Sequence, residues 1–215
     1  AEGTVPVLSD GIRVYNISVV GDVLYLDVTD TRGKDLRLIS SLDSELWTYD
    51  PFADEPNITK ICSAENGLIF GGGVTEFQGS VYFTVIQGEG YVASLWKTDG
   101  TAAGTALVMD LTPGSHSSMG YPWSSAISHM TSMGDLAFFY IVSNSGGASS
   151  YNAAFVTDGT PEGTFAIANS SSLGYVSSVT GFTAIGDQMY FVVGAGGSNL
   201  YVSDGTINGT TAITP

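Results

Sequence analysis

The sequence predicts an all-β protein in the form of a β-propeller built from four-stranded antiparallel blades. Short apolar segments lie between glycine-containing turns, two motifs each recur four times, and the period of recurrence is near 50 to 55 residues. With 28 Gly among 215 residues and 13% charged residues, the composition favours short strands joined by tight turns over helices. We therefore expect a single domain with almost no helix.

The first motif is a hairpin signal around a glycine. It occurs as "VVGDVLYL" at 19, "EFQGSVYF" at 76, "SMGDLAFF" at 132 and "AIGDQMYF" at 184. Apolar residues on both sides of such a dipeptide are typical of a two-residue β-hairpin. The glycines of the four copies lie 58, 55 and 52 residues apart: Gly21, Gly79, Gly134 and Gly186. Each copy therefore predicts the first two strands of a unit.

The second motif ends a strand with an aspartate and continues as a turn. It occurs as "LWTYDPFADEP" at 46, "LWKTDGTAAGT" at 95, "AFVTDGTPEGT" at 154 and "LYVSDGTINGT" at 200. In the second unit we expect strands over 73–77, 80–86, 93–99 and 105–111, and the third and fourth units repeat this order. A four-stranded unit with this period is typical of propeller blades, which we place at about 1–72, 73–125, 126–178 and 179–215.

The residues after the third strand suit a structural turn. An aspartate at the end of a strand accepts hydrogen bonds from turn amides, and the following glycine supplies a positive φ. Contact with a ligand is the alternative role. In the first copy, Pro51 and Phe52 follow Asp50, so we expect that turn to differ. The regular copies provide the predicted turn residues Asp99, Gly100, Thr101, Asp158, Gly159, Thr160, Asp204, Gly205 and Thr206.

An aromatic residue stands three positions before each of these aspartates. A large ring at this place in the third strand can fill the wedge between adjacent blades. We therefore predict that four aromatic residues belong to the blade core: Trp47, Trp96, Phe155 and Tyr201.

The repeated pattern resembles the ELWxxDGT repeat, which is found in tandem in large secreted and surface proteins. The stretch "SLWKTDGTAAGTALVMDLTPGS" at 94 is the copy most similar to it, and the resemblance spans nearly the whole chain. It departs from the pattern most in the first unit, after Asp50. The resemblance implies a scaffold in an extracellular setting, and it carries no catalytic residues over to this chain.

Composition excludes several classes of function. Six Lys plus Arg against 21 Asp plus Glu give a formal charge of −15, which lacks the phosphate-neutralising contacts of a nucleic-acid-binding protein. No apolar run of about 18 residues is present, so we expect no membrane insertion. Cys62 is the only cysteine, which excludes an internal disulfide and predicts a buried, inert thiol.

The familiar catalytic motifs are missing from the sequence. It contains no Gly-x-Ser-x-Gly elbow, no His-Glu-x-x-His and no phosphate-binding loop, and "GGG" at 71 lacks the context of a dinucleotide site. His116 and His129 do not recur between units, so we expect surface or packing roles for both. The segment Asp27–Asp35 has several carboxylates but not the spacing of an EF-hand, so weak, adventitious calcium is the only cofactor that the sequence suggests.

Four Asn-x-Ser/Thr sequons point to the outside of the cell. Three of them are predicted glycosylation sites, at Asn16, Asn57 and Asn169. The fourth, Asn208, lies inside the tight turn of the last unit, where we expect less room for a sugar. The start "AEGTVPV" would also suit a chain trimmed after a signal peptide. We therefore expect a secreted or cell-surface protein.

The function expected from these features is that of a non-catalytic propeller module, a structural or adhesion building block of an extracellular assembly. Its partners would be other protein chains or copies of itself. The alternatives are a glycan-binding propeller, suggested by aromatic residues beside Asp and Asn, and an extracellular hydrolase or lyase with a site on irregular loops. The four blades either close on themselves, with "TVPVL" pairing beside the fourth unit, or belong to a larger ring.

Overall fold

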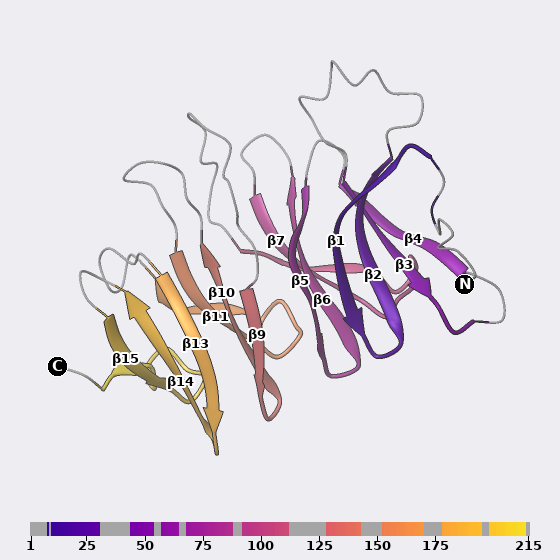
Figure 1. Ribbon diagram of the computed structural model, residues 1–215. Coiled ribbons are helices and arrows are strands. Elements are labelled where there is room, and N and C mark those ends of the chain that lie inside the picture. The colour runs from indigo at the N-terminus through magenta and orange to yellow at the C-terminus, as the bar shows by residue number, and fades with distance from the viewer. Residues whose placement is uncertain are drawn as a thin grey trace, which may run out of the picture.

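The computed structural model describes residues 8, 10–30, 44–53, 57–64, 68–87, 92–111, 128–142, 152–169, 178–194 and 198–213. These residues form sixteen strands, β1 to β16, in four separate sheets (Figure 1). Among the described residues there is no helix that is long and apolar enough to cross a membrane.

Each sheet contains four consecutive antiparallel strands, so each is one blade. The first blade consists of β1 (Ile12–Val20), β2 (Val23–Asp30), β3 (Ser44–Asp50) and β4 (Asn57–Ala64). The second consists of β5 (Leu68–Phe77), β6 (Ser80–Gln87), β7 (Val92–Thr98) and β8 (Ala106–Asp110). The third consists of β9 (Ser128–Met133), β10 (Leu136–Val142), β11 (Asn152–Thr157) and β12 (Phe165–Asn169). The fourth consists of β13 (Ser178–Ile185), β14 (Gln188–Gly194), β15 (Ser198–Ser203) and β16 (Thr211–Ala212).

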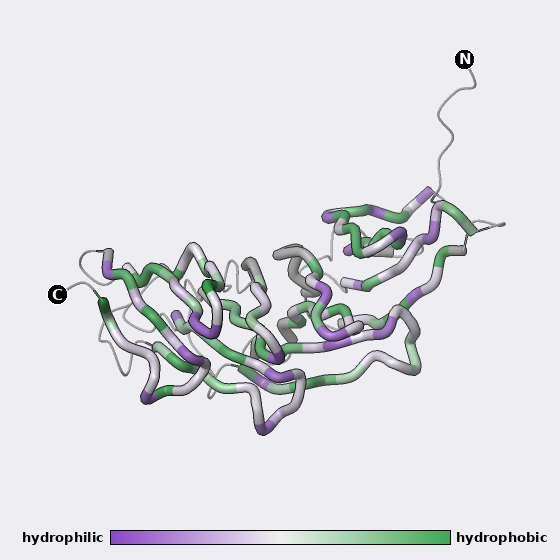
Figure 2. Tube along the Cα trace, turned by 90° about the horizontal axis from the view of Figure 1, so that it is seen from below, coloured by the Kyte–Doolittle hydropathy of each residue, from purple (hydrophilic) through white to green (hydrophobic). Residues whose placement is uncertain are grey.

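The prediction of an all-β propeller of four-stranded blades is confirmed. The first strands of successive blades contact one another, so they lie on the inner side of the row. Figure 2 shows the four blades along a curved path, with the first and the fourth at opposite ends. The expected break at 72 falls inside β5, which begins four residues earlier, at Leu68. The segment "TVPVL" lies outside the described residues except for Leu8.

The hairpins between the first two strands use two turn types. Gly21, Gly134 and Gly186 take the first turn position with φ of 57 to 59°, whereas in the second blade both Gln78 (φ 50°) and Gly79 (φ 71°) have positive φ. Both patterns belong to the hairpin turns whose twist matches that of the strands. The glycine of the second copy therefore stands one position later in its turn than the other three.

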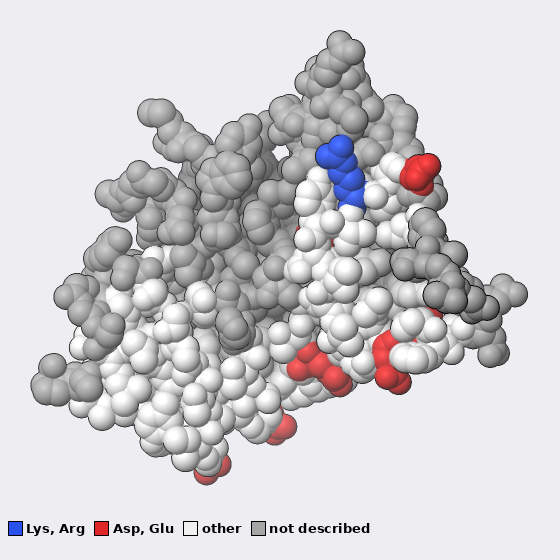
Figure 3. All heavy atoms as spheres, viewed as in Figure 1, with Lys and Arg blue, Asp and Glu red and all other residues white. Residues whose placement is uncertain are grey.

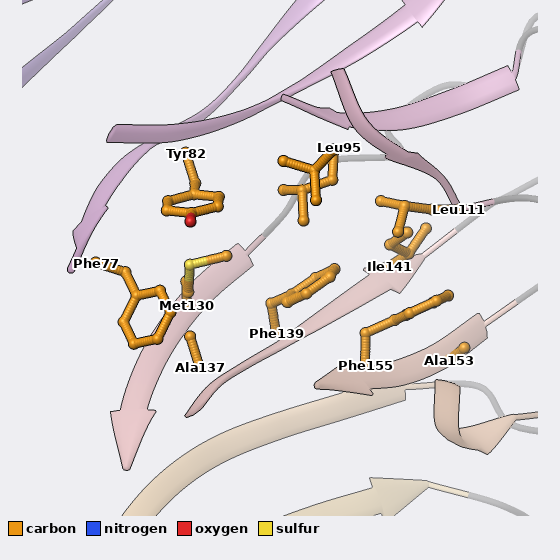
Figure 4. Packing of buried hydrophobic residues seen from close by; sticks show 11 residues of the cluster. Phe77, Tyr82, Leu95, Leu111, Met130, Ala137, Phe139, Ile141, Ala153 and Phe155 are labelled. Atoms are coloured by element: carbon orange, nitrogen blue, oxygen red, sulfur yellow. The ribbon is translucent and has the colours of Figure 1, made fainter. Parts of the chain in front are cut away.

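The core lies between successive blades rather than within them. Between the second and third blades, Tyr82 and Leu95 project toward Phe139 and Phe155, and all four side chains are buried (Figure 4). The rings of Phe139 and Phe155 stack with their centroids 5.3 Å apart. Because neighbouring strand residues point to opposite faces of a sheet, each blade offers one face to the blade before it and one to the blade after it.

The other two junctions are built in the same way. Phe83 faces Tyr25 and Leu46 of the first blade, and Phe191 faces Phe138 and Ala154 of the third. Burial of one such phenylalanine contributes roughly 1.5–3 kcal/mol to folding. The stability of the row therefore depends on contacts between neighbouring blades.

We predict that Phe139→Ala lowers the free energy of unfolding by roughly 3–5 kcal/mol, because it empties the centre of the junction between the second and third blades. Leu107→Ala, on the exposed side of β8 at 47% exposure, is the matched control and should change it by less than about 1 kcal/mol. Urea denaturation measures both. Equal effects would show that the blade junction is not the core.

Candidate functional site

The recurrent turn after the third strand is the most regular polar arrangement in the described residues. In each of the three regular copies, one aspartate oxygen accepts two hydrogen bonds from the threonine two residues later. The backbone N–H of that threonine lies 2.8–2.9 Å from Oδ1, and its hydroxyl lies 2.7 Å from the same atom. The aspartates are Asp99, Asp158 and Asp204. The turn is therefore closed by its own side chains, as predicted.

Further hydrogen bonds to hydroxyl side chains complete the turn. The threonine of the Asp-Gly-Thr triplet accepts a hydrogen bond from the N–H of a later glycine, at 2.9–3.0 Å. The residue before each aspartate, Thr98, Thr157 or Ser203, is fully buried and accepts the N–H of the triplet glycine at 2.9–3.0 Å. This buried hydroxyl was missed in the sequence, although Thr or Ser precedes the aspartate in every regular copy.

These hydrogen bonds fix the charge state of the aspartates. Hydrogen bonds from the Thr101 hydroxyl and N–H lower the pKa of Asp99 from its usual value, and the equivalent contacts lower those of Asp158 and Asp204. All three carboxylates are exposed. A carboxylate with a lowered pKa is a poor proton donor at neutral pH, so this arrangement suits a structural acceptor rather than a general acid.

The glycine of each triplet lies over a side chain of the preceding blade. A Cβ on Gly159 would lie 2.6 Å from the Tyr82 hydroxyl, and one on Gly100 would lie 3.5 Å from that of Tyr25. A Cβ on Gly205 would overlap Leu136 and lie 3.7 Å from Phe138. The three glycines have φ of 88 to 94°, which L-residues rarely adopt. The turn therefore also serves as a contact between blades.

The aromatic partners of these glycines were also missed in the sequence. Tyr25, Tyr82 and Phe138 occupy the same position of the second strand, since each pairs with the residue two before the turn aspartate. The signal was present, because the hairpin motif contains an aromatic residue at this place in every copy. The fourth member of the set is Tyr190, which pairs with Val202.

The first copy of the turn differs only in part. Asp50 Oδ1 accepts the backbone N–H of Phe52 at 2.8 Å, which is the same contact that the regular copies make. Pro51 and Phe52 replace the glycine and the threonine, so the threonine hydroxyl contacts cannot form. Phe52 is 78% exposed. The prediction that this turn should differ is therefore correct for its side chains but not for its backbone bond.

Three of the four predicted core aromatics lie at blade junctions. Trp96, Phe155 and Tyr201 each stack on a phenylalanine of the neighbouring second strand, and Phe155 is fully enclosed. Trp47 does not separate two described blades. It lies on the outer face of the first blade, opposite to Leu46, and its Nε1 donates to Glu45 at 2.7 Å. The prediction for Trp47 is therefore not confirmed among the described residues, where no blade precedes the first.

The remaining candidates lie apart from one another. Cys62 is half-buried, and burial raises the pKa of its thiol to about 11, which agrees with an inert thiol. Asp27 accepts a hydrogen bond from Ser44 at 2.6 Å, while residues 31–35 of the calcium candidate lie outside the described residues. His116 also lies outside them, and His129 lies in β9. No group of three His, Cys, Asp or Glu with metal-site geometry occurs among the described residues.

The sequons lie on three of the four blades, with Asn16 and Asn57 both on the first. Asn16 is half-buried in β1, Asn169 is half-buried at the end of β12, and Asn57 begins β4. The side chain of Asn57 lies outside the described part of the chain. Asn208 is exposed in the turn between β15 and β16, and the expectation that this turn leaves less room for a sugar stays a prediction.

We predict that Gly159→Ala destabilises the protein more than Gly100→Ala. Both substitutions place a side chain at a positive φ, which costs of order 1–3 kcal/mol, but only Gly159 would press a Cβ against the buried Tyr82 hydroxyl. The difference between the two variants should be about 1 kcal/mol or more in urea denaturation. Combining Gly159→Ala with Tyr82→Phe should remove it. A difference that survives Tyr82→Phe would contradict this contact.

We also predict that the melting temperature falls as the pH drops below about 4. The three turn aspartates have lowered pKa values in the folded protein, so the unfolded chain binds protons first. Their stabilising contribution is complete above the unfolded pKa and is lost as the pH falls through the folded pKa. A triple Asp99→Asn, Asp158→Asn and Asp204→Asn variant should show a flatter melting profile below pH 4.

The Asp27→Asn variant is the control for this experiment. Burial raises its pKa to about 6, so its effect has the opposite sign, and stability is lost as the pH rises from about 4 to 6. Asp27→Asn should flatten the profile in that upper window and leave the acid side unchanged. An acid side that is unaltered in the triple variant would contradict the role of the turn aspartates.

Comparison with known proteins supports the fold and leaves the family open. No family model matches the chain, and no curated protein matches it. A prolyl endopeptidase studied for inter-domain dynamics in catalysis and specificity has a similar structure, with a TM-score of 0.52 and 11% identity over 94% of this chain. The chain spans about a quarter of its length, 26%. A family 117 glycoside hydrolase produced by the marine bacterium Zobellia galactanivorans gives a TM-score of 0.45 at 10% identity, covering 95% of this chain and 70% of the hydrolase.

Proposed function

We propose that this protein is a secreted, non-catalytic β-propeller module of the ELWxxDGT type, which serves as a structural or adhesion building block of an extracellular assembly. It acts through contacts with other protein chains. The observation that carries this proposal is the position of its exposed large hydrophobic side chains: among the described residues, they gather on the two end blades.

The outer side of the first blade exposes several apolar residues. Ile17 is 58% exposed and Val19 is 63% exposed, and both pair with β2 residues on the face that points away from the second blade. The fourth blade exposes Ile185, Leu200, Ile207 and Ile213. Among the exposed large hydrophobics of the described residues, only Leu107 belongs to a middle blade. Apolar surface gathered in this way marks a protein contact rather than a solvated surface.

The charge distribution is compatible with this role. Most of the described surface in Figure 3 carries neither acidic nor basic side chains, and the acidic groups that are visible lie mainly along the lower rim. Interface centres are depleted in charged residues, which would have to lose their hydration on contact. The net charge of −15 keeps the molecule soluble while its end blades remain apolar.

Two further observations support the extracellular and non-catalytic parts of the proposal. The sequons at Asn16, Asn57 and Asn169 are consistent with a secretory route in a host that glycosylates such sites. The recurrent aspartates, which would be the obvious candidates for chemistry, have their Oδ1 atoms committed to the turns. These carboxylates therefore have a structural use that accounts for their recurrence.

We predict that the protein occurs in a larger complex in the extracellular fraction of its native source, and that Val19→Asp or Ile185→Asp releases it. Each substitution places a charge in an apolar end face, which should weaken a contact by about tenfold or more. Native electrophoresis of tagged protein measures the bound fraction. Leu107→Asp is the matched control on a middle blade and should leave the complex intact.

Three results would contradict the proposal. One is a free monomer in the native extracellular fraction. Another is glycan-array binding that persists in the Val19→Asp and Ile185→Asp variants, which would favour a lectin. The third is hydrolytic or lyase activity that a single acidic-residue substitution abolishes, which would favour an enzyme.

A further inference from the structure

We propose that the outer face of the fourth blade binds one additional blade with a regular Asp-Gly-Thr turn, supplied by a partner chain of the same repeat type. We call this face the open seat and define it by Tyr190, Leu200 and Ile213. This inference rests on the proposed function, because it names one contact face and the chemistry of its partner.

The open seat has three counterparts inside the molecule. Strand pairing places Tyr190 at the position of Tyr25, Tyr82 and Phe138, and it places Leu200 at the position of Leu46, Leu95 and Ala154. Ile213 comes directly after Ala212, the residue that pairs with Tyr201. Val108 and Ile167 hold the same place on their blades, because they come directly after the pairs Trp96–Leu107 and Phe155–Ala166. In the first blade, Ile61 follows Trp47–Lys60 in the same way.

All the counterparts are buried by the following blade. The first three blades bury every residue at these positions, with exposures between 0 and 6%. Each set belongs to a hydrophobic cluster shared with the next blade. On the fourth blade, Leu200 is 36% exposed, Ile213 is 48% exposed and Tyr190 is half-buried. The open seat is therefore a blade-binding face that lacks its blade among the described residues.

The partner that fits this face is defined by the three existing junctions. Each contributes a glycine at positive φ, which lets the turn approach the aromatic side chain of the preceding blade closely. Each also contributes a phenylalanine of the second strand, stacked on an aromatic residue of the third. At the open seat the glycine would lie over Tyr190, whose hydroxyl now donates to Gln188 at 3.0 Å.

A second copy of this chain does not offer these features on its first blade. Pro51 stands where the glycine is needed. At the equivalent position of the third blade, Gly159, a Cβ alone would already lie too close to the Tyr82 hydroxyl, and a proline ring is larger than a Cβ. On the first blade, Leu26 and Val28 stand at the positions that Phe83 and Val85 hold on the second blade. Both are already buried, at 5% and 0% exposure. A regular blade is therefore a better match than head-to-tail association of identical chains.

The test adds a fifth blade to the intact chain, by fusing a second copy of residues 170–213 behind Pro215. Fusion supplies the blade at high effective concentration, so the natural partner is not needed. In repeat proteins each additional interface raises stability, and we expect the melting temperature to rise by roughly 5 °C. The added blade should also resist limited proteolysis. An unchanged melting temperature together with rapid cleavage of the added blade would overturn the proposal.

Leu200→Asp provides the matched control, made in both the original and the fused chain. In the original chain its side chain is partly exposed, so the melting temperature should change little, whereas in the fused chain the gain from the fifth blade should be lost. An equal effect in both chains would show that the added blade does not occupy the open seat. Ultracentrifugation of the original chain should show a monomer, and a dimer that Leu200→Asp dissociates would identify a second copy as the occupant instead.

The two proposals fail in different ways. If the fused blade does not dock but the complex in the native source persists, the module still acts through protein contacts and only the assigned partner is wrong. If the blade docks but no complex exists in the source, the open seat accepts blades and the assembly role is wrong.

Discussion

The fold depends on the burial of apolar side chains between successive sheets. A single four-stranded sheet of this chain has two faces, and each of the middle blades covers both of them with a neighbour. The buried rings of Phe139 and Phe155 against Leu95 illustrate this burial, and the other two junctions also bury apolar side chains between sheets. Hydrogen bonds within a sheet align its strands, but the contacts that exclude water lie between sheets.

The recurrent turn supports these junctions and does not compete with them. Its aspartate and threonine satisfy the backbone N–H groups of the turn internally, so the turn reaches the next blade with few unpaired polar groups. The glycine then allows close approach to an aromatic side chain such as Tyr82. Lys97 adds a polar link across the same junction, because its Nζ donates to the Gly159 carbonyl at 3.0 Å. A single sequence motif thus combines local closure with contact between blades.

Sequence alone predicted the strands well, because their alternation and turn residues are local signals. It also placed Trp96, Phe155 and Tyr201 in the core, since the motif repeats them at a fixed distance from the aspartate. It could not place Trp47, because the motif is the same whether or not another blade precedes it. The partners Tyr25, Tyr82 and Phe138 were missed for a related reason, because their contacts join residues 67 to 77 positions apart, as in Tyr25 and Gly100. The hairpin motif repeats the aromatic residue in every copy, but the repeat alone does not show which residue it contacts.

The antiparallel order of each blade also separates two kinds of connection. The short hairpins and the Asp-Gly-Thr turns leave the strands at one rim, whereas the connections from second to third strand leave at the other. At that second rim the connecting segments differ in length, as residues 31–43, 88–91, 143–151 and 195–197 show. Insertions there do not alter the spacing of the residues that stack one blade on the next. Descendants of such a chain could therefore diversify one rim to recognise new molecules while they inherit an unchanged way of assembling.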